Sequence, residues 1–243
     1  MEFRPVHLCI IQPLGYVHSL GFLDQARYLR YQFRRFGVDV TIAKNRLKHG
    51  AVNVVLGAHL GFDPELRKRY ACIFFNLEQM GEGGAQVSDA YRQLLGTSAV
   101  FDYDEGNPPH YTSYVEDVPL LSFGHAPYLD TSSIALNERP IDLLFFGSMN
   151  ERRRRIIQEI EDAGGHVTLL DGPVYGPERD ALIRQSKAVL NCHYYETARF
   201  EQARVFHQRA QPAGERGRQV GQRDHVAGHG RTGTEEHDHR GGA

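Results

Sequence analysis

Short apolar runs alternate with polar or amphipathic stretches along roughly the first 206 residues of the chain. The run VHLCII at residues 6–11 is rich in β-branched residues and predicts a strand. Apolar residues at helical spacing follow, at positions 22, 26, 29, 33 and 36. Gly37 is a typical helix stop, and VDVTIA at 38–43 predicts the next strand. Strand, helix and strand form a βαβ unit, which implies a parallel sheet with ligands at the carboxyl ends of its strands.

The same alternation continues to about residue 129. Four further strands are predicted, at NVVLGAHL, ACIFFNLE, SAVFDY and LLSFG. Polar or helical stretches such as DPELRKRY and VSDAYRQLL separate them. We therefore predict one Rossmann-like domain over residues 1–129, followed by a polar, proline-containing linker at 130–140.

A second domain of the same type is predicted over residues 141–206. IDLLFFGS indicates a strand, Asn150 a helix N-cap, and ERRRRIIQEIEDAGG a helix that Gly164 or Gly165 ends. HVTLLDG, PERDALIRQS and KAVLNCHYY then predict strand, helix and strand, and ETARFEQARVF the start of another helix. The fold class is therefore α/β, with two Rossmann-like domains of which the second is incomplete.

Residues 207–243 break this pattern. They contain no Leu, Ile, Phe, Tyr, Met or Cys, and they are rich in Gly, Arg and His. Such a segment cannot bury enough apolar area to offset its chain entropy, so we expect it to be disordered. Without fixed geometry its histidines are not expected to form a metal site.

Composition adds three expectations. The 28 Lys and Arg balance 30 Asp and Glu, so no global field favours nucleic acid or an anionic membrane. Cys9, Cys72 and Cys192 lie in apolar runs without metal-binding spacing, which indicates buried, reduced thiols. No signal peptide or membrane-spanning run is apparent, so a cytoplasmic, soluble chain is expected.

The stretch FFGSMNERRRR carries the first candidate site. Gly147 and Ser148 lie between a predicted strand and a helix N-terminus, where backbone N–H groups can bind a phosphate. An arginine of the first turn, such as Arg153, could clamp that phosphate in a bidentate manner. The same arginine run would equally suit a solvated helix face, and a nucleic-acid patch is a further alternative.

Polar residues also follow the last predicted strand. His193, Tyr194 and Glu196 lie where that strand ends, the usual ligand side of a parallel sheet. Glu201 and Arg204 on the next helix could form a surface ion pair, or Glu201 could accept the hydroxyls of a ribose.

The first domain has three further candidate site residues, each of which follows a predicted strand. His18, between Gly15 and Gly21, could act as a base or a hydrogen-bond donor, or lie in a structural turn. Glu78 and Asp102 are better explained as helix caps or solvated loop residues.

The order and spacing of five stretches resemble those of a known family: PLGYVHS, FFNLEQM, VFDYDEGN, IDLLFFGSMNERRRRII and VLNCHYYETARFEQARVF. Through these stretches the chain resembles bacterial GT-B-type glycosyltransferases of the CgeB-like or family 1 group. The resemblance covers roughly residues 6–206. It implies an acceptor-side first domain and a second domain that binds a nucleotide-diphosphate sugar. The acceptor would be a glycan or a lipid-linked molecule, which would bring the chain close to a membrane, and nucleic acid is not an expected partner.

The resemblance also implies roles for individual residues. Gly147 and Ser148 would line the diphosphate turn, and Arg153 would contact the diphosphate. The ribose would be held by Glu201, the sugar and phosphates would lie beside His193, Tyr194 and Glu196, and the acceptor or sugar beside His18. No cofactor or metal is expected, because helix N-termini and arginine could carry the leaving group's charge.

The chain departs from this family after residue 206, where further apolar helices and strands would be expected. The composition of 207–243 is typical of a GC-rich gene read in a shifted frame, and we hypothesise a frameshift near codon 207. Loss of those elements would leave little catalysis. The alternatives are a non-enzymatic Rossmann-like module that binds a nucleotide or partner and, less well supported, a response-regulator-like pair of domains.

Overall fold

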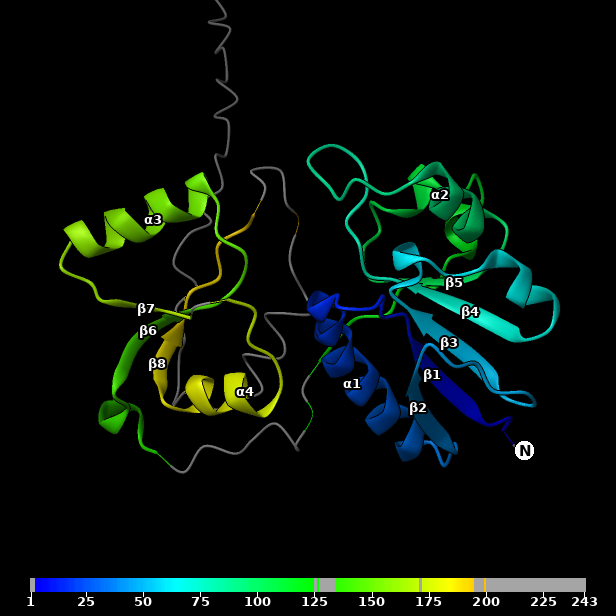
Figure 1. The fold of residues 1–243 in the computed structure, drawn as a ribbon, viewed down its shortest axis with the longest axis horizontal. Coiled ribbons are helices and arrows are strands. Elements are labelled where there is room, and N and C mark those ends of the chain that lie inside the picture. The colour runs from blue at the N-terminus through cyan, green and yellow to red at the C-terminus, as the bar shows by residue number, and fades with distance from the viewer. Residues whose placement is uncertain (1–2, 125, 127–133, 171, 195–198, 200–243) are drawn as a thin grey trace, which may run out of the picture.

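The computed structural model describes residues 3–124, 126, 134–170, 172–194 and 199. These residues form two separate parallel β-sheets, each flanked by helices. The two sheets lie side by side in Figure 1. The predicted α/β, Rossmann-like fold is therefore confirmed. Residues 207–243, predicted to be disordered, and residues 130–133 of the predicted linker lie outside the described residues.

The first sheet has five parallel strands in the order β2-β1-β3-β4-β5. The strands are β1 (Val6–Ile10), β2 (Val40–Lys44), β3 (Val52–Leu56), β4 (Ala71–Asn76) and β5 (Ala99–Asp102). Strand β1 pairs with β2 on one side and with β3 on the other, so that Leu8 lies between Ile42 and Val54. The predicted β1–α1–β2 unit is confirmed.

The second sheet has three parallel strands in the order β7-β6-β8. The strands are β6 (Ile141–Phe145), β7 (Val167–Leu169) and β8 (Ser186–Val189). Strand β6 lies in the middle, because both of its neighbours pair with it in parallel.

Four α-helices connect the strands: α1 (Phe22–Arg35), α2 (Asp89–Gly96), α3 (Glu151–Asp162) and α4 (Pro177–Arg184). Helix α1 buries Ala26 and Leu29 as its apolar spacing predicts. Asn150 caps α3, since its Oδ1 accepts a 2.9 Å hydrogen bond from the backbone N–H of Arg153. Short 3₁₀ helices follow β1 at Val17–Gly21 (η1) and β3 at Ala58–Leu60 (η2).

Two predictions of detail are wrong. Phe36 lies just beyond the end of α1 and is 72% exposed, because the helix stops before its apolar stripe is complete. LLSFG is not a strand: Leu120 forms a single bridge to Asp102, and Pro119 beside it has no N–H with which to extend a ladder.

Both faces of the first sheet are covered, as expected for strands that read as continuous apolar runs. One face packs against α1 through residues such as Leu8, Ile10 and Leu56. The opposite face packs against α2 through residues such as Val55 and Phe74. In the second sheet, Phe145, Val167 and Cys192 pack against Ile157 of α3. All three cysteines are free, with Cys9 and Cys192 buried and Cys72 partly buried.

No described helix is long and apolar enough to cross a membrane.

Candidate functional site

In each sheet, the first strand in the sequence pairs on its two sides with the next two strands of the sequence. Strand β1 has β2 and β3 as its neighbours, and β6 has β7 and β8. In open parallel sheets, ligands bind beyond the carboxyl ends of strands at such a switch point. The candidate site therefore comprises the loops that follow β1 and β3 in one sheet and β6 and β8 in the other.

The loop after β6 makes an exposed turn into α3. Gly147 has φ of 132°, a backbone conformation that glycine adopts far more readily than other residues. Gly147 and Ser148 are both exposed, and α3 begins three residues later at Glu151. The exposed turn and the helix N-terminus together provide backbone N–H groups suited to an anion.

Hydrogen bonds from the start of α3 tie this turn to the loop after β8. Asn150 Nδ2 donates to the carbonyl of Tyr194 at 2.7 Å. Arg152 Nη1 donates to the carbonyl of His193, also at 2.7 Å. The structure thus brings Gly147, Ser148 and Arg153 together with His193 and Tyr194, which follow them by at least 40 positions in the sequence. Glu196 and Glu201 lie outside the described residues.

Arg153 is placed differently from its predicted position against a diphosphate. Its side chain is buried, with 1% of the residue exposed. Nε and Nη2 donate to the carbonyl of Cys192 at 3.0 and 2.8 Å, and Nη1 donates to the carbonyl of Ser148 at 2.6 Å. The guanidinium also lies 5.4 Å from the ring centre of Phe145 and 5.2 Å from that of Tyr194. In this structure Arg153 positions the two loops rather than facing solvent.

A buried acceptor in the loop after β8 lacks a partner. Asn191 Oδ1 is inaccessible to solvent and accepts no hydrogen bond from the described residues. Gln25 Oε1, in the first turn of α1, is in the same situation. Buried amide oxygens are almost always satisfied, so each of these atoms suits a water or ligand donor.

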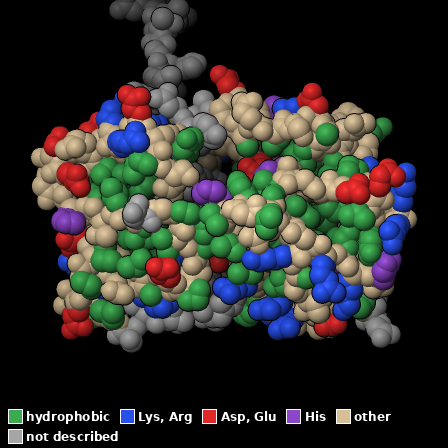
Figure 2. Space-filling view, viewed as in Figure 1, with side chains coloured by type: hydrophobic (Ala, Val, Ile, Leu, Met, Phe, Trp, Pro, Cys, Tyr) green, Lys and Arg blue, Asp and Glu red, His purple; other side chains and the backbone are tan. Residues whose placement is uncertain are grey.

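The two halves of the molecule meet through α1, η1 and α4. His18 in η1 is exposed, and its Nδ1 lies 3.0 Å from the hydroxyl of Tyr175, which precedes α4. Arg179 of α4 forms a buried 2.7 Å ion pair with Asp24 of α1. Figure 2 shows a hollow between the two halves. His18 therefore lies where the first half of the molecule meets the second.

A histidine that the sequence analysis did not single out packs against the first residue of α1, Phe22. His59, in η2 directly after β3, has its Nε2 3.4 Å from Glu78 Oε1. The rings of Phe22 and Tyr91 contact it edge-on. Burial lowers the pKa of His59, while the charge of Glu78 opposes that shift. Only the strand order, which places β3 next to β1, could have indicated this residue.

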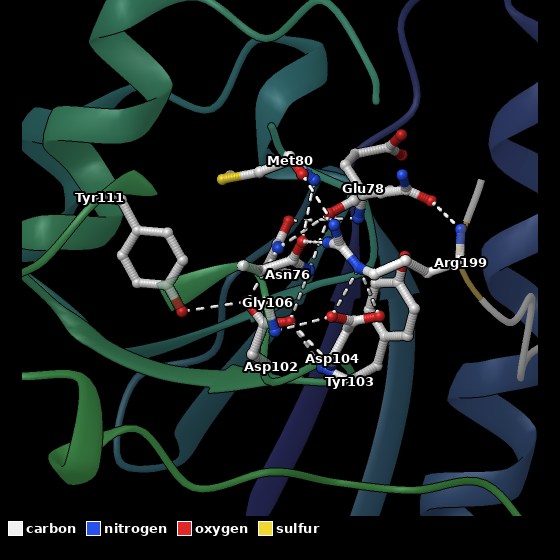
Figure 3. A network of polar contacts seen from close by, with 11 residues as sticks. Asn76, Glu78, Met80, Asp102, Tyr103, Asp104, Gly106, Tyr111 and Arg199 are labelled. Carbon is white, nitrogen blue, oxygen red and sulfur yellow. Dashed lines mark hydrogen bonds and ion pairs between the residues drawn. The ribbon is translucent and has the colours of Figure 1, made fainter. Parts of the chain in front are cut away.

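Asp102 is the centre of a buried polar network at the end of β5 (Figure 3). Its carboxylate accepts hydrogen bonds from the side chains of Asn76, Asn107 and Tyr111 at 2.7–2.9 Å. It also accepts bonds from the backbone N–H groups of Tyr103 and Asp104. Burial raises the pKa of Asp102 although these hydrogen bonds lower it. The prediction that Asp102 caps a helix or is solvated is wrong, and Glu78 pairs with His59 instead of capping a helix.

Arg199, beyond β8 in the sequence, reaches the same edge of the first sheet (Figure 3). Its Nε donates to both carboxylate oxygens of Asp104, at 2.8 and 2.9 Å. Its Nη1 donates to the carbonyl of Met80 at 3.2 Å, and its Nη2 to Asn107 Oδ1. Arg199 is therefore held against the first sheet.

Among the described residues, no group of three His, Cys, Asp or Glu side chains is arranged to hold a metal ion.

Comparison with known proteins identifies one distant relative. The uncharacterized protein L140 of Acanthamoeba polyphaga mimivirus is 26% identical over 137 residues, which are 53% of this chain. The matched region spans only 42% of that relative's length. No family model matches the chain, and no solved structure matches it significantly. These comparisons supply no family, so the function is inferred from the candidate site.

Proposed function

We propose that this chain derives from a GT-B-type glycosyltransferase, with a nucleotide-diphosphate-sugar site on the second sheet and an acceptor side on the first. The observation that carries the proposal is the junction of the Gly147–Ser148 turn, the N-terminus of α3 and the loop after β8. Its backbone N–H groups suit a diphosphate, and the adjoining His193 and Tyr194 suit a sugar and its phosphates.

The proposed reaction is a group transfer. An acceptor hydroxyl oxygen bonds to the anomeric carbon of the donor sugar, and the bond from that carbon to the diphosphate oxygen breaks. The nucleoside diphosphate leaves with the electron pair, and the helix N-terminus of α3 stabilises its charge. In the proposal, His18 contacts the acceptor or the sugar and takes up the hydroxyl proton.

Arg153 has a supporting role in this proposal. Because its donors are bound to the carbonyls of Cys192 and Ser148, it holds the phosphate-binding turn in shape. Arg152 is partly exposed at the same helix start and is the better placed cation for a diphosphate.

Calorimetric titration of the full chain with UDP, GDP and UDP-glucose tests the donor site. Ser148→Glu places a negative charge in the exposed turn, and we expect it to weaken nucleotide binding by at least about tenfold. Ser113→Glu, in an exposed loop of the first half, is the matched control and should bind like the wild type. Folded protein without saturable nucleotide binding, or equal loss in both variants, would contradict the proposal.

Release of UDP from UDP-glucose separates the enzyme from a non-enzymatic module. Turnover that depends on an added glycan or lipid-linked acceptor supports the transferase. Tight binding of UDP without turnover across a panel of such acceptors would fit a nucleotide-binding module, or a transferase-derived chain that has lost its activity with the elements expected after residue 206.

A further inference from the structure

Positive charge is concentrated around β2, the edge strand of the first sheet. Figure 2 shows Lys and Arg side chains gathered over α1 and β2 in the lower middle of the view. Between residues 25 and 62 the chain has seven basic residues, and Asp39 is the only acidic one. We call the surface of α1, of β2 and of the loop after β2, which together surround this edge of the sheet, the basic face; its basic residues are Arg27, Arg30, Arg34, Arg35, Lys44, Arg46 and Lys48.

The charges of the basic face are accessible. Arg27 and Arg30 are partly exposed, and the other five residues are exposed. None of the seven forms an ion pair with a carboxylate of the described residues. By contrast, exposed Lys68 and Lys187 and partly exposed Arg92 each have an acidic partner within 2.6 Å. The basic face therefore keeps a positive field that no ion pair with a carboxylate of the described residues neutralises.

The rest of the chain has the opposite balance, with 21 Lys and Arg against 29 Asp and Glu. A near-neutral total thus hides a charge asymmetry, which the overall count of 28 against 30 did not reveal. Such a molecule is oriented by an anionic surface, because the basic face is attracted while the remainder is repelled.

We propose that the basic face docks on an anionic lipid surface. Phe36 supports a lipid in preference to a nucleic acid: it is 72% exposed and directly follows Arg34 and Arg35. An exposed aromatic ring beside cations suits insertion at the boundary between headgroups and acyl chains. The inference does not depend on the proposed transferase activity.

Vesicle co-sedimentation of the full chain tests this proposal. We expect binding to vesicles of equal parts phosphatidylserine and phosphatidylcholine, release by added salt, and no binding to pure phosphatidylcholine. The triple variant R34E/R35E/K44E should bind at least about a hundredfold more weakly. Its three positions are exposed and make no ion pair with described residues, so the fold should be retained. Phe36→Ala should weaken binding at every salt concentration.

The control variant K68E/R154E/R155E makes the same change in net charge at exposed positions elsewhere. It should bind within about threefold of the wild type, because it leaves the basic face intact. Equal loss in the two triple variants would overturn the proposal. So would equal binding to neutral vesicles, or retention of a duplex DNA probe at salt concentrations that release the protein from the anionic vesicles.

Discussion

Burial and a nearby carboxylate act on His59 in opposite directions. Its pKa is lowered from the ordinary value of 6.5 by burial, and Glu78 partly offsets this shift. Because the folded protein then binds the proton less readily than the unfolded chain, stability from this group is lost as the pH falls from 6.5 through the folded pKa. The folded state thus favours the neutral imidazole, the form that can accept a proton.

Glu78→Gln removes the opposing charge, so we expect the pKa of His59 to fall further. Proton NMR titration of the imidazole measures the midpoint directly. Glu65→Gln, at an exposed position of the first half, is the control and should leave the midpoint unchanged. A midpoint that rises in Glu78→Gln would show that the pair does not interact as described.

The buried carboxylate of Asp102 stabilises the fold as a hydrogen-bond acceptor. Asp102→Asn would turn an amide N–H₂ group toward at least one existing donor, such as Asn76 Nδ2. We expect a loss of about 2–4 kcal/mol in the free energy of unfolding, measured by chemical denaturation. Asp117→Asn, at an exposed position, should change it by less than about 0.5 kcal/mol.

The pH dependence of this loss has a definite sign. The folded-state pKa of Asp102 is raised above its ordinary 3.8, so its contribution to stability is lost as the pH rises through the folded pKa. Asn does not titrate. The cost of Asp102→Asn should therefore be larger near about pH 4 than near about pH 7. The opposite order would mean that the hydrogen bonds outweigh burial.

The packing of helix α3 depends on the buried guanidinium of Arg153 rather than on the exposed arginines of the same helix. Replacing Arg153 with Met leaves the carbonyls of Cys192 and Ser148 without their donors. We expect this variant to lose about 2–4 kcal/mol in the free energy of unfolding. Arg154→Met, one residue later and exposed, should cost less than about 0.5 kcal/mol. Equal effects would show that Arg153 does not fix the two loops.

The helices were largely predictable from local pattern. The apolar spacing of α1 and the Asn150 cap of α3 are local features of the sequence, so both can be recognised without knowledge of tertiary contacts. The prediction of a strand at LLSFG was wrong because a short apolar run is compatible with a loop that packs against the core as well as with a strand. Phe123 from that run does pack into the core, at 6% exposure, without joining a ladder.

The contact between the two halves depends on a buried ion pair. Asp24 and Arg179 have side-chain exposures of 12% and 6%, and Asp180 also pairs with Arg179. Desolvation lowers the pKa of Arg179, but hydrogen bonds and charge from the two aspartates outweigh it and raise the pKa overall. The guanidinium is therefore charged where the halves meet.

A double-mutant cycle measures the strength of this contact. Asp24→Ala, Arg179→Ala and the double variant should give a coupling of about 1–3 kcal/mol in chemical denaturation. The exposed pair of Asp142 and Lys187, with a similar separation of 2.6 Å, is the matched control and should give a clearly smaller coupling. Comparable couplings would argue that the Asp24–Arg179 pair does not secure the interface.

At the scale of the whole molecule, strand order and long-range contact separate what was predictable from what was not. The alternation of apolar runs and amphipathic stretches was enough for the α/β class and for the turn at Gly147 and Ser148, because these depend on neighbouring residues. The pairing of His59 with Glu78, the burial of Arg153 and the reach of Arg199 depend on which strands become neighbours. That choice follows from packing energies summed over the whole core, and no local stretch of sequence records it.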